Sequence, residues 1–316
     1  MKRLTSLLLA TLLIIALFGC AQQDAPATTQ MEESTMPKNI MQKSDPTQDD
    51  ELNILMIGSS FCYYYVEELY GMLTAAGYKN ANVCNVYYSG CPLQSHWEWW
   101  KSGEANYDYY TTNSDGRNGI KNANLEYCLQ QRNWDIISLQ ESTHKIRNGG
   151  GEQHFLNTQT YLTDLWGYIQ EQYPQSRYFW HQPWAYQVGA DKNGVKMTDL
   201  AMQLAHTLPL KDYAIRVCKE FGLERVNSGE AWQIVREGGY DNLCARSGIN
   251  DNKGDYSHDG DIGGGQYLNA CVWFEIITGQ SCIGNTYRPN YNLEEALIPT
   301  LQEAAHQAVA QRNAEQ

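Results

Sequence analysis

Basic residues are scarce in this 316-residue chain, in which 23 lysine and arginine residues stand against 36 aspartate and glutamate residues. The formal net charge is −13 at pH 7. Because nucleic-acid binding depends on neutralising phosphates with lysine and arginine, this balance argues against a nucleic-acid partner. Aromatic residues are abundant instead, with 22 tyrosines and nine tryptophans. In an exported protein they suit stacking on sugar rings, although packing in the core explains them equally well.

The chain also lacks the short motifs of several common sites. It has no Cys-x-x-Cys pair, no His-Glu-x-x-His zinc motif and no glycine-rich phosphate loop after a strand. The acidic run at residues 251–255 does not match a calcium loop, because Lys253 occupies a ligand position. We therefore expect neither a metal ion nor an organic cofactor, with calcium in that run as the less favoured alternative.

No apolar run is long enough for a comfortable transmembrane span. The longest, Leu7–Phe18, follows two basic residues and is typical of a secretory signal. It runs into Leu-Phe-Gly-Cys at residues 17–20, which resembles the lipobox of bacterial lipoproteins. We predict a signal peptide over residues 1–19 and lipidation of Cys20, with a conventional cleavage site as the alternative. The protein would then be exported and anchored by lipid to a bacterial membrane, facing away from the cytoplasm.

The segment over residues 20–50 carries Gln, Thr, Pro and Ser without any helical or strand period, which is typical of a solvated tether. Residues 51–316 are long enough for one sizeable domain with its own core. Eight cysteines remain after Cys20, and an even number outside the cytoplasm permits disulfides without requiring them. Several, such as Cys271 in an apolar stretch, suit buried thiols.

Strand-like and helix-like stretches alternate along this domain. Short apolar runs predict strands over Asn53–Ile57, Ala81–Tyr88, Asp135–Leu139, Ser176–Trp180 and Leu223–Val226. Helical spacing predicts helices over Val66–Ala76, Gly119–Arg132, Phe155–Tyr173, Asp199–Phe221 with an interruption near Pro209, Gly229–Glu237 and Gly263–Thr278, while Asn292–Arg312 closes the chain. Such alternation predicts an α/β fold with a parallel sheet covered on both faces.

Four of the predicted strands are followed by residues that suit a binding site: Ser60, Gly90, Gln140 and His181. In an open parallel sheet, ligands bind outside the carboxyl ends of the strands, where the strand order reverses. Because unrelated polar residues would not concentrate on one edge, we expect these four to come together in a site.

A serine nucleophile is offered by the Gly-Ser-Ser sequence that ends at Ser60, and a base by the Asp-x-x-His sequence from Asp255 to His258. A serine hydroxyl is a poor nucleophile at neutral pH and needs an imidazole that a third group holds in place. The three-residue spacing lets a turn bring the Asp255 carboxylate onto the His258 ring. Cys62 stands where the Gly-x-Ser-x-Gly elbow has its last glycine, which disfavours an α/β-hydrolase.

These blocks resemble those of the SGNH, or GDSL-like, hydrolases, in an uncharacterised exported bacterial branch. The likeness runs from Leu52 to about Gly279 and is carried by residues 57–61, 89–91, 134–142, 180–186 and 255–258. It implies a three-layer αβα sandwich around a parallel, flavodoxin-like sheet. It also implies that Ser60 attacks an ester carbonyl, that His258 takes its proton, and that Asp255 steadies the imidazolium.

The resemblance further implies an oxyanion hole made by the backbone N–H groups of Ser60 and Gly90. The family's usual third donor is an asparagine in a Gly-x-Asn-Asp block, which this chain lacks. Gln140, in Leu-Gln-Glu-Ser, is similar to the glutamine of carbohydrate and sialate acetylesterases and is predicted to replace it. Ser59 is a second departure, because relatives carry Asp or Asn there; of the two adjacent serines, the Gly-x-Ser register favours Ser60.

Together these features predict an extracytoplasmic serine esterase that removes a small acyl group, with acetyl favoured, from a carbohydrate. An acylated carbohydrate or another small ester is the expected partner, and membrane contact is expected through the lipid anchor only. We predict substrate contacts from His181 and Trp184. Stacking faces are offered by Trp97, Trp99, Trp100, Trp180 and Trp184. The alternatives are a catalytically inactive glycan-binding lipoprotein with the same fold, and a peptidase or lipase that uses the same triad.

Overall fold

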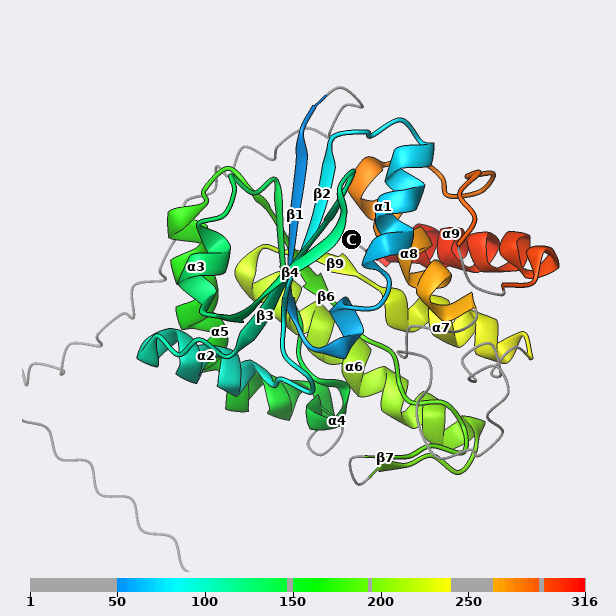
Figure 1. Ribbon diagram of the computed structural model, residues 1–316. Helices are drawn as coiled ribbons and strands as arrows, with labels where there is room; N and C mark the ends of the chain where they lie inside the picture. Colours follow the sequence, from blue (N-terminus) through cyan, green and yellow to red (C-terminus); the bar gives the residue numbers. More distant parts are fainter. Residues whose placement is uncertain (1–49, 147–149, 193–194, 240–263, 290–292, 316) are drawn as a thin grey trace, which may run out of the picture. The chain divides into compact units, whose positions relative to one another are not determined.

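The computed structural model describes residues 50–146, 150–192, 195–239, 264–289 and 293–315. All of them belong to the second of the two units into which the chain divides, Ile40–Gln316. Seven strands form one sheet in the order β4-β3-β2-β1-β5-β6-β9 (Figure 1). Their bounds are β1 Leu52–Gly58, β2 Ala81–Tyr87, β3 Tyr107–Asn113, β4 Gly116–Ala123, β5 Ile136–Leu139, β6 Arg177–His181 and β9 Glu224–Val226.

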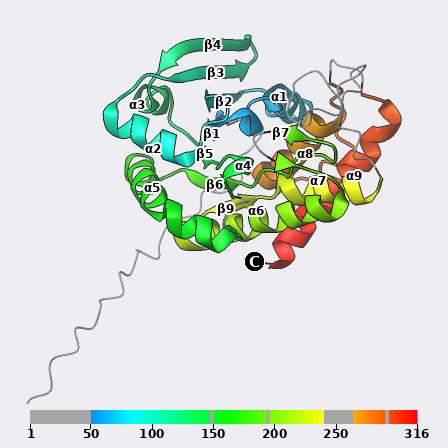
Figure 2. The same ribbon diagram turned by 90° about the horizontal axis from the view of Figure 1, so that it is seen from below.

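Five neighbouring strands of this sheet, β2, β1, β5, β6 and β9, run parallel. Counted along the chain, their order is 2-1-3-4-5, which is the order of flavodoxin-like sheets. The strands β3 and β4 extend the sheet antiparallel beyond β2, and Figure 2 shows them at its outer edge. The predicted α/β fold with a flavodoxin-like sheet is confirmed.

Helices cover both faces of the sheet, as the three-layer prediction requires. One layer contains α2 Leu93–Ser102, α3 Leu125–Leu129, α5 Gly150–Gln172 and α6 Leu200–Phe221. The other contains α1 Val66–Ala75, α7 Ser228–Glu237, α8 Gly264–Thr278 and α9 Ile298–Glu315 (Figure 1). Shorter elements are the 3₁₀ turns η1 Ser60–Cys62 and η4 Glu295–Leu297, the helix α4 Thr143–Ile146, and the small hairpin of β7 Asp191–Lys192 and β8 Val195–Lys196.

The helix predicted over Gly119–Arg132 is wrong in its first half, where the hairpin of β3 and β4 lies instead. The tyrosines and threonines of β3 favour a strand, and the Asp-Gly sequence ending at Gly116 is a hairpin signal. Gly116 takes a φ of +88°, which favours glycine. Helix α3 begins only after Asn124, whose side chain accepts a hydrogen bond from the N–H of Tyr127 and caps the helix.

Two further differences concern helices. The structure adds helix α2, which is rich in tryptophan and lies outside the predicted helices. Helix α6 is continuous through Pro209, so the predicted interruption is wrong. A proline removes one intrahelical hydrogen bond, but Leu210, Tyr213 and Ala214 are buried directly after it. Tertiary packing of this apolar face outweighs the local cost of the proline.

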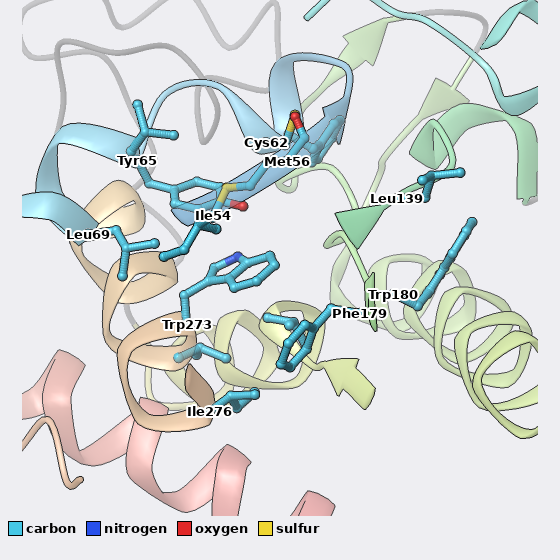
Figure 3. Close-up of a cluster of buried hydrophobic side chains, with 14 of the residues drawn as sticks. Ile54, Met56, Cys62, Tyr65, Leu69, Leu139, Phe179, Trp180, Trp273 and Ile276 are labelled. Atoms are coloured by element: carbon cyan, nitrogen blue, oxygen red, sulfur yellow. The ribbon is translucent and has the colours of Figure 1, made fainter. Parts of the chain in front are cut away.

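The core between the sheet and the α1–α8 layer is built from aromatic and aliphatic side chains (Figure 3). Every residue of α8 is buried, which is typical of a helix enclosed by the protein on all sides. Trp273 of α8 stacks on Tyr65 at a centroid distance of 6.4 Å and meets Phe179 of β6 at 5.9 Å. These contacts fix the position of α8 against the strands that carry the site.

The described part of the chain contains no helix that combines the length and hydropathy needed to cross a membrane. It contains seven cysteines, and none of the seven forms a disulfide. Cys271 is fully buried in α8, as predicted. Burial of most of these thiols makes them small apolar side chains of the core.

Glu68 of α1 is 7 % exposed, and its Oε2 atom has no hydrogen-bond partner among the described residues. Burial raises the pKa of this carboxyl from 4.5 to about 7. Since the pKa is raised in the folded state, the contribution of Glu68 to the free energy of unfolding is greatest below about pH 4.5 and is lost as the pH rises through about 7. We expect Glu68→Gln to leave stability nearly unchanged at pH 4.5 and to raise it by about 3 kcal/mol at pH 8, measured by urea unfolding. An equal change in the free energy of unfolding at pH 4.5 and pH 8 would contradict the raised pKa of Glu68.

Candidate active site

The residues predicted at four strand ends do lie at one edge of the sheet, because β2, β1, β5 and β6 are neighbouring parallel strands. Side chains link these ends. The Gln140 amide donates from Nε2 to Ser59 Oγ at 2.8 Å, and its Oε1 lies 3.2 Å from Nδ1 of His181. Ser142 Oγ donates to the backbone carbonyl of Gly90 at 3.2 Å. The four strand ends thus share one edge, while a single site formed by Ser60, Gly90, Gln140 and His181 stays a prediction.

The two adjacent serines have different surroundings. Ser59 is 1 % exposed, and its hydroxyl is held by Gln140. Ser60 is partly exposed and begins the η1 turn, and within the described ranges its hydroxyl has no hydrogen-bond partner. The turn itself is closed by the N–H of Cys62, which donates to the Ser59 carbonyl at 3.0 Å. A ligand at this edge therefore meets the Ser60 hydroxyl rather than that of Ser59.

Gly90 sits in the loop that follows β2, with a φ of +65°. This left-handed conformation favours glycine, and a Cβ atom there would point into open space. The loop is tied to the end of β5 by Ser142, whose hydroxyl also donates to the Cys91 carbonyl at 2.7 Å. It thus presents backbone beside the Ser60 turn without a side chain in the way.

Glu141, next to Gln140, holds the end of the loop that follows Gly90, where α2 begins. Its carboxylate is 1 % exposed, and Oε1 accepts from the N–H of Leu93 at 3.0 Å and from the N–H of Ser142 at 2.7 Å. Its Oε2 lies 3.1 Å from Nε2 of His154, at the start of α5. A buried carboxylate with backbone and imidazole partners is a strong local constraint. Glu141 therefore fixes the chain around Gly90 and the beginning of α2.

The Gln140 side chain is 1 % exposed and tightly enclosed. A Cβ atom added to Gly58 would collide with its Cγ and lie 2.7 Å from its Cδ. The glycine at the end of β1 therefore makes room for this amide. One hydrogen of the amide goes to Ser59, and the other has no acceptor among the described residues. The oxyanion role predicted for Gln140 stays a prediction.

His181 and Trp184, predicted to contact substrate, are 1 % and 0 % exposed. Burial lowers the pKa of the His181 imidazole to about 3, because a charged ring would lose its hydration there. Trp184 stacks on Trp232, and Trp180 is also fully buried. None of these three side chains has an open face for a sugar ring. Sequence position alone does not reveal that these side chains, at and just after the end of β6, are buried in the core.

Two further aromatic residues, the exposed Tyr88 and the half-buried Tyr63, stand close in the sequence to Gly90 and Ser60. Tyr88, two residues before Gly90, is 44 % exposed and meets the edge of Trp99 at a centroid distance of 4.8 Å. Tyr63, three residues after Ser60, stacks on Tyr87 at 4.3 Å. Their positions directly beside the two motif residues were the signal that could have found them.

The remaining predicted site residues, Asp255, His258 and the lipidation site Cys20, lie outside the described residues. The described chain resumes at Gly264, the first residue of α8. The last turn of α8 lies at the amino end of β6, because Arg177 Nη1 donates to the carbonyl of Ile277 at 2.9 Å. Trp273, further back along α8, meets the ring of His181 at 5.4 Å. Helix α8 therefore begins toward the carboxyl edge of the sheet, the edge that carries Ser60.

Within the described ranges, no group of three or more His, Cys, Asp or Glu side chains is arranged to hold a metal ion.

The family model described as "Domain of unknown function (DUF4886)" matches residues 53–308. The chain belongs to this family. A solved DUF4886 family protein from Bacteroides uniformis is similar, with a TM-score of 0.70 and 25% identity over 83% of this chain and 95% of that chain. A comparison with curated proteins gives no match.

Two more distant solved structures are hydrolases by name. A protein from Parabacteroides merdae named as a GDSL-like lipase has a TM-score of 0.45 and 15% identity, over 73% of this chain and 96% of that chain. An acetyl xylan esterase from Geobacillus stearothermophilus has a TM-score of 0.45 and 14% identity, over 76% of this chain and 100% of that chain. Likenesses this remote do not identify the chemistry of the present family member.

Proposed function

We propose that this DUF4886 protein is a serine esterase that removes a small acyl group, acetyl in the first instance, from a carbohydrate. The observation that carries the proposal is the contrast between the two serines at the carboxyl edge of the sheet. Ser60 is partly exposed with a hydroxyl that no described residue engages, while Ser59 is buried and held by Gln140. A nucleophile must be reachable, and its oxygen must not already be held by a hydrogen bond from another side chain.

In the proposed reaction the Ser60 Oγ attacks the ester carbonyl, and His258 takes the hydroxyl proton. The tetrahedral oxyanion accepts hydrogen bonds from the backbone N–H groups of Ser60 and Gly90 and from the Gln140 amide. Collapse of this intermediate breaks the bond to the sugar oxygen, which takes the proton back from His258. Water then attacks the acyl-serine with His258 again as base, releasing the acid and restoring Ser60. Asp255 would hold the imidazole in the required tautomer.

The direction of α8 supports this assignment of the base. Helix α8 begins toward the carboxyl edge of the sheet, and Asp255 and His258 precede its first residue, Gly264, in the sequence. The described chain thus resumes six residues after His258, with α8 beginning toward the edge of the sheet that carries Ser60. A start at the amino edge would have argued against a triad with Ser60.

A carbohydrate substrate is supported by the aromatic side chains beside the site. Tyr88 is 44 % exposed and braced by Trp99, so its ring has a fixed orientation and an open surface. The Tyr63 ring, in contrast, is covered by Tyr87 at a centroid distance of 4.3 Å and by the Arg117 guanidinium 4.0 Å from its centre, so it braces Tyr87 and offers no free face of its own. Rigid aromatic faces with polar hydroxyls suit sugar rings, which offer C–H groups and hydroxyls together.

We also propose that the protein acts outside the cytoplasm on a lipid anchor. The support is the signal-like run Leu7–Phe18 and the cysteine at position 20 that follows it. The tether-like composition of residues 20–50 would hold the catalytic domain away from the membrane. An anchored esterase of this kind would act on glycans that reach the cell surface.

Two measurements on the purified domain test the proposal. We expect a fluorophosphonate probe to label Ser60, with the labelled peptide identified by mass spectrometry, because only an activated serine reacts. We also expect acetate release from acetylated oligosaccharides. No labelling and no release, combined with measurable binding of the same oligosaccharides, would instead identify an inactive glycan-binding lipoprotein. Faster hydrolysis of long-chain esters or of amides would point to the lipase or peptidase alternative.

A further inference from the structure

A continuous line of buried hydrogen bonds runs behind the serine turn, from β1 across β5 and β6 to the start of α7. Its members are Ser59, Gln140, His181 and Ser228, and each is at most 1 % exposed. Ser59 Oγ lies 2.8 Å from Gln140 Nε2, and Gln140 Oε1 lies 3.2 Å from His181 Nδ1. His181 Nε2 in turn lies 3.0 Å from Ser228 Oγ. Four residues far apart in the sequence are thereby coupled in one chain.

Such a chain has two self-consistent arrangements of protons. In the first, Ser228 donates to Nε2 of His181, Nδ1–H donates to the Gln140 carbonyl oxygen, and the Gln140 NH₂ group faces the serine turn. In the second arrangement, donor and acceptor exchange roles in every hydrogen bond of the chain. His181 then donates from Nε2 to Ser228, and the Gln140 carbonyl oxygen faces the turn. Only the first arrangement gives Gln140 a donor at the place where an oxyanion would form.

The orientation of the Gln140 amide in the structure corresponds to the first arrangement. From this geometry we infer that His181 is a positioning residue, whose Nδ1–H holds the Gln140 carboxamide with its NH₂ group toward the serine turn. This inference rests on the proposed esterase function, since it assigns His181 a role through the oxyanion donor. It also replaces the substrate contact predicted for His181, which its burial leaves without an open face.

The surroundings of the ring keep this arrangement constant. The ring hydrogen bonds to Gln140 and Ser228, lies 3.4 Å through Nδ1 from the Tyr65 hydroxyl, and packs against the rings of Trp184 and Trp273. These neighbours carry no charge at neutral pH. Burial lowers the pKa of His181 to about 3, so the ring stays neutral wherever the enzyme is folded and active. The amide orientation should not change with pH.

Two substitutions at His181 separate positioning from simple packing. His181→Asn keeps an amide donor near the place of Nδ1 and loses the contact with Ser228. His181→Gln keeps a polar group near the place of Nε2 and loses the contact with Gln140. Both remove the ring, so both should lower the unfolding temperature by similar amounts. We expect His181→Asn to keep most of the wild-type kcat and His181→Gln to lose kcat about 100-fold, with KM little changed in either.

Equal losses in kcat for the two folded variants would overturn the inference, because a packing role predicts activity that follows stability alone. If neither variant folds, Ser228→Ala provides the test, since it removes a single hydroxyl. Without that hydroxyl the reversed arrangement would leave a buried Nε2–H donor with no acceptor, so Ser228→Ala should keep the Nδ1–H tautomer and most of the wild-type kcat. A folded Ser228→Ala that lost kcat about 100-fold would overturn the inference, because it would show that the amide orientation does not depend on the Nδ1–H tautomer.

Nitrogen NMR of histidine-labelled protein gives a readout that does not depend on activity. The signal that disappears in His181→Asn should show the Nδ1–H tautomer, unchanged between pH 5 and pH 8 as expected for a pKa of about 3. An Nε2–H tautomer would contradict the inference even in an active enzyme. A wild-type protein without labelling or ester hydrolysis would contradict the esterase proposal instead, and with it the role of His181 in catalysis. The two failures are therefore distinguishable.

Discussion

Replacing Ser60 with alanine should reduce the rate of ester hydrolysis at least about 10⁴-fold, because the covalent step has no other nucleophile at the exposed position. The hydroxyl makes no hydrogen bond to any described residue, so its removal should leave stability within about 0.5 kcal/mol of the wild type. The measurement is the initial rate of acetate release from p-nitrophenyl acetate, with the unfolding temperature as the check on the fold.

Ser59→Ala is the matched control, since it removes a neighbouring hydroxyl of the same kind. That hydroxyl accepts from the Gln140 amide in a buried site, so its loss leaves a donor unsatisfied and should cost about 1–3 kcal/mol of stability. We expect activity to fall far less than in Ser60→Ala. The opposite pattern, with Ser59→Ala inactive and Ser60→Ala active, would assign the nucleophile to Ser59. Full activity in both variants would refute the serine mechanism.

The parallel sheet could be predicted because its signal is local. Strand β1 is buried along its whole length, and such a strand appears in the sequence as one continuous apolar run. The residue after each such run then falls at the same edge by geometry alone, which is why Ser60 and Gln140 could be placed together. Strand β4 is exposed along almost its whole length, so its sequence carries no alternation of apolar and polar residues that would predict a strand.

The internal arrangement of the site could not be predicted in the same way. Whether His181 points to the substrate or into the core depends on Trp273 and Ser228, which lie on helices far along the chain. Likewise, nothing local to Gln140 indicates that its amide would engage Ser59. Contacts of this kind depend on how helices and strands pack against one another. A sequence pattern predicts the helices and strands but not that packing. Asp255 and His258 lie outside the described residues, so their roles remain predictions.

Gly58→Ala should lower kcat about 100-fold without blocking the fold. Gly58 does not take a positive φ, so alanine fits its backbone. The added Cβ, however, would collide with Gln140 Cγ and lie 2.7 Å from its Cδ, and the amide must move away. Loss of one oxyanion donor typically costs 10²- to 10³-fold in kcat. The displaced side chain should also cost about 1–3 kcal/mol of stability.

Gly167→Ala is the control, because this exposed glycine of α5 has no atom within 4 Å of an added Cβ. It should keep full activity and gain up to about 1 kcal/mol of helix stability. The double variant Gly58→Ala with Gln140→Ala then separates the two explanations of a slow Gly58→Ala enzyme. If the methyl group acts by displacing the amide, the double variant should be no slower than Gln140→Ala alone, since the donor is already absent. If the fold-losses in kcat of the two single variants multiply in the double variant, the added methyl group has instead shifted the end of β1 and the Ser60 turn with it.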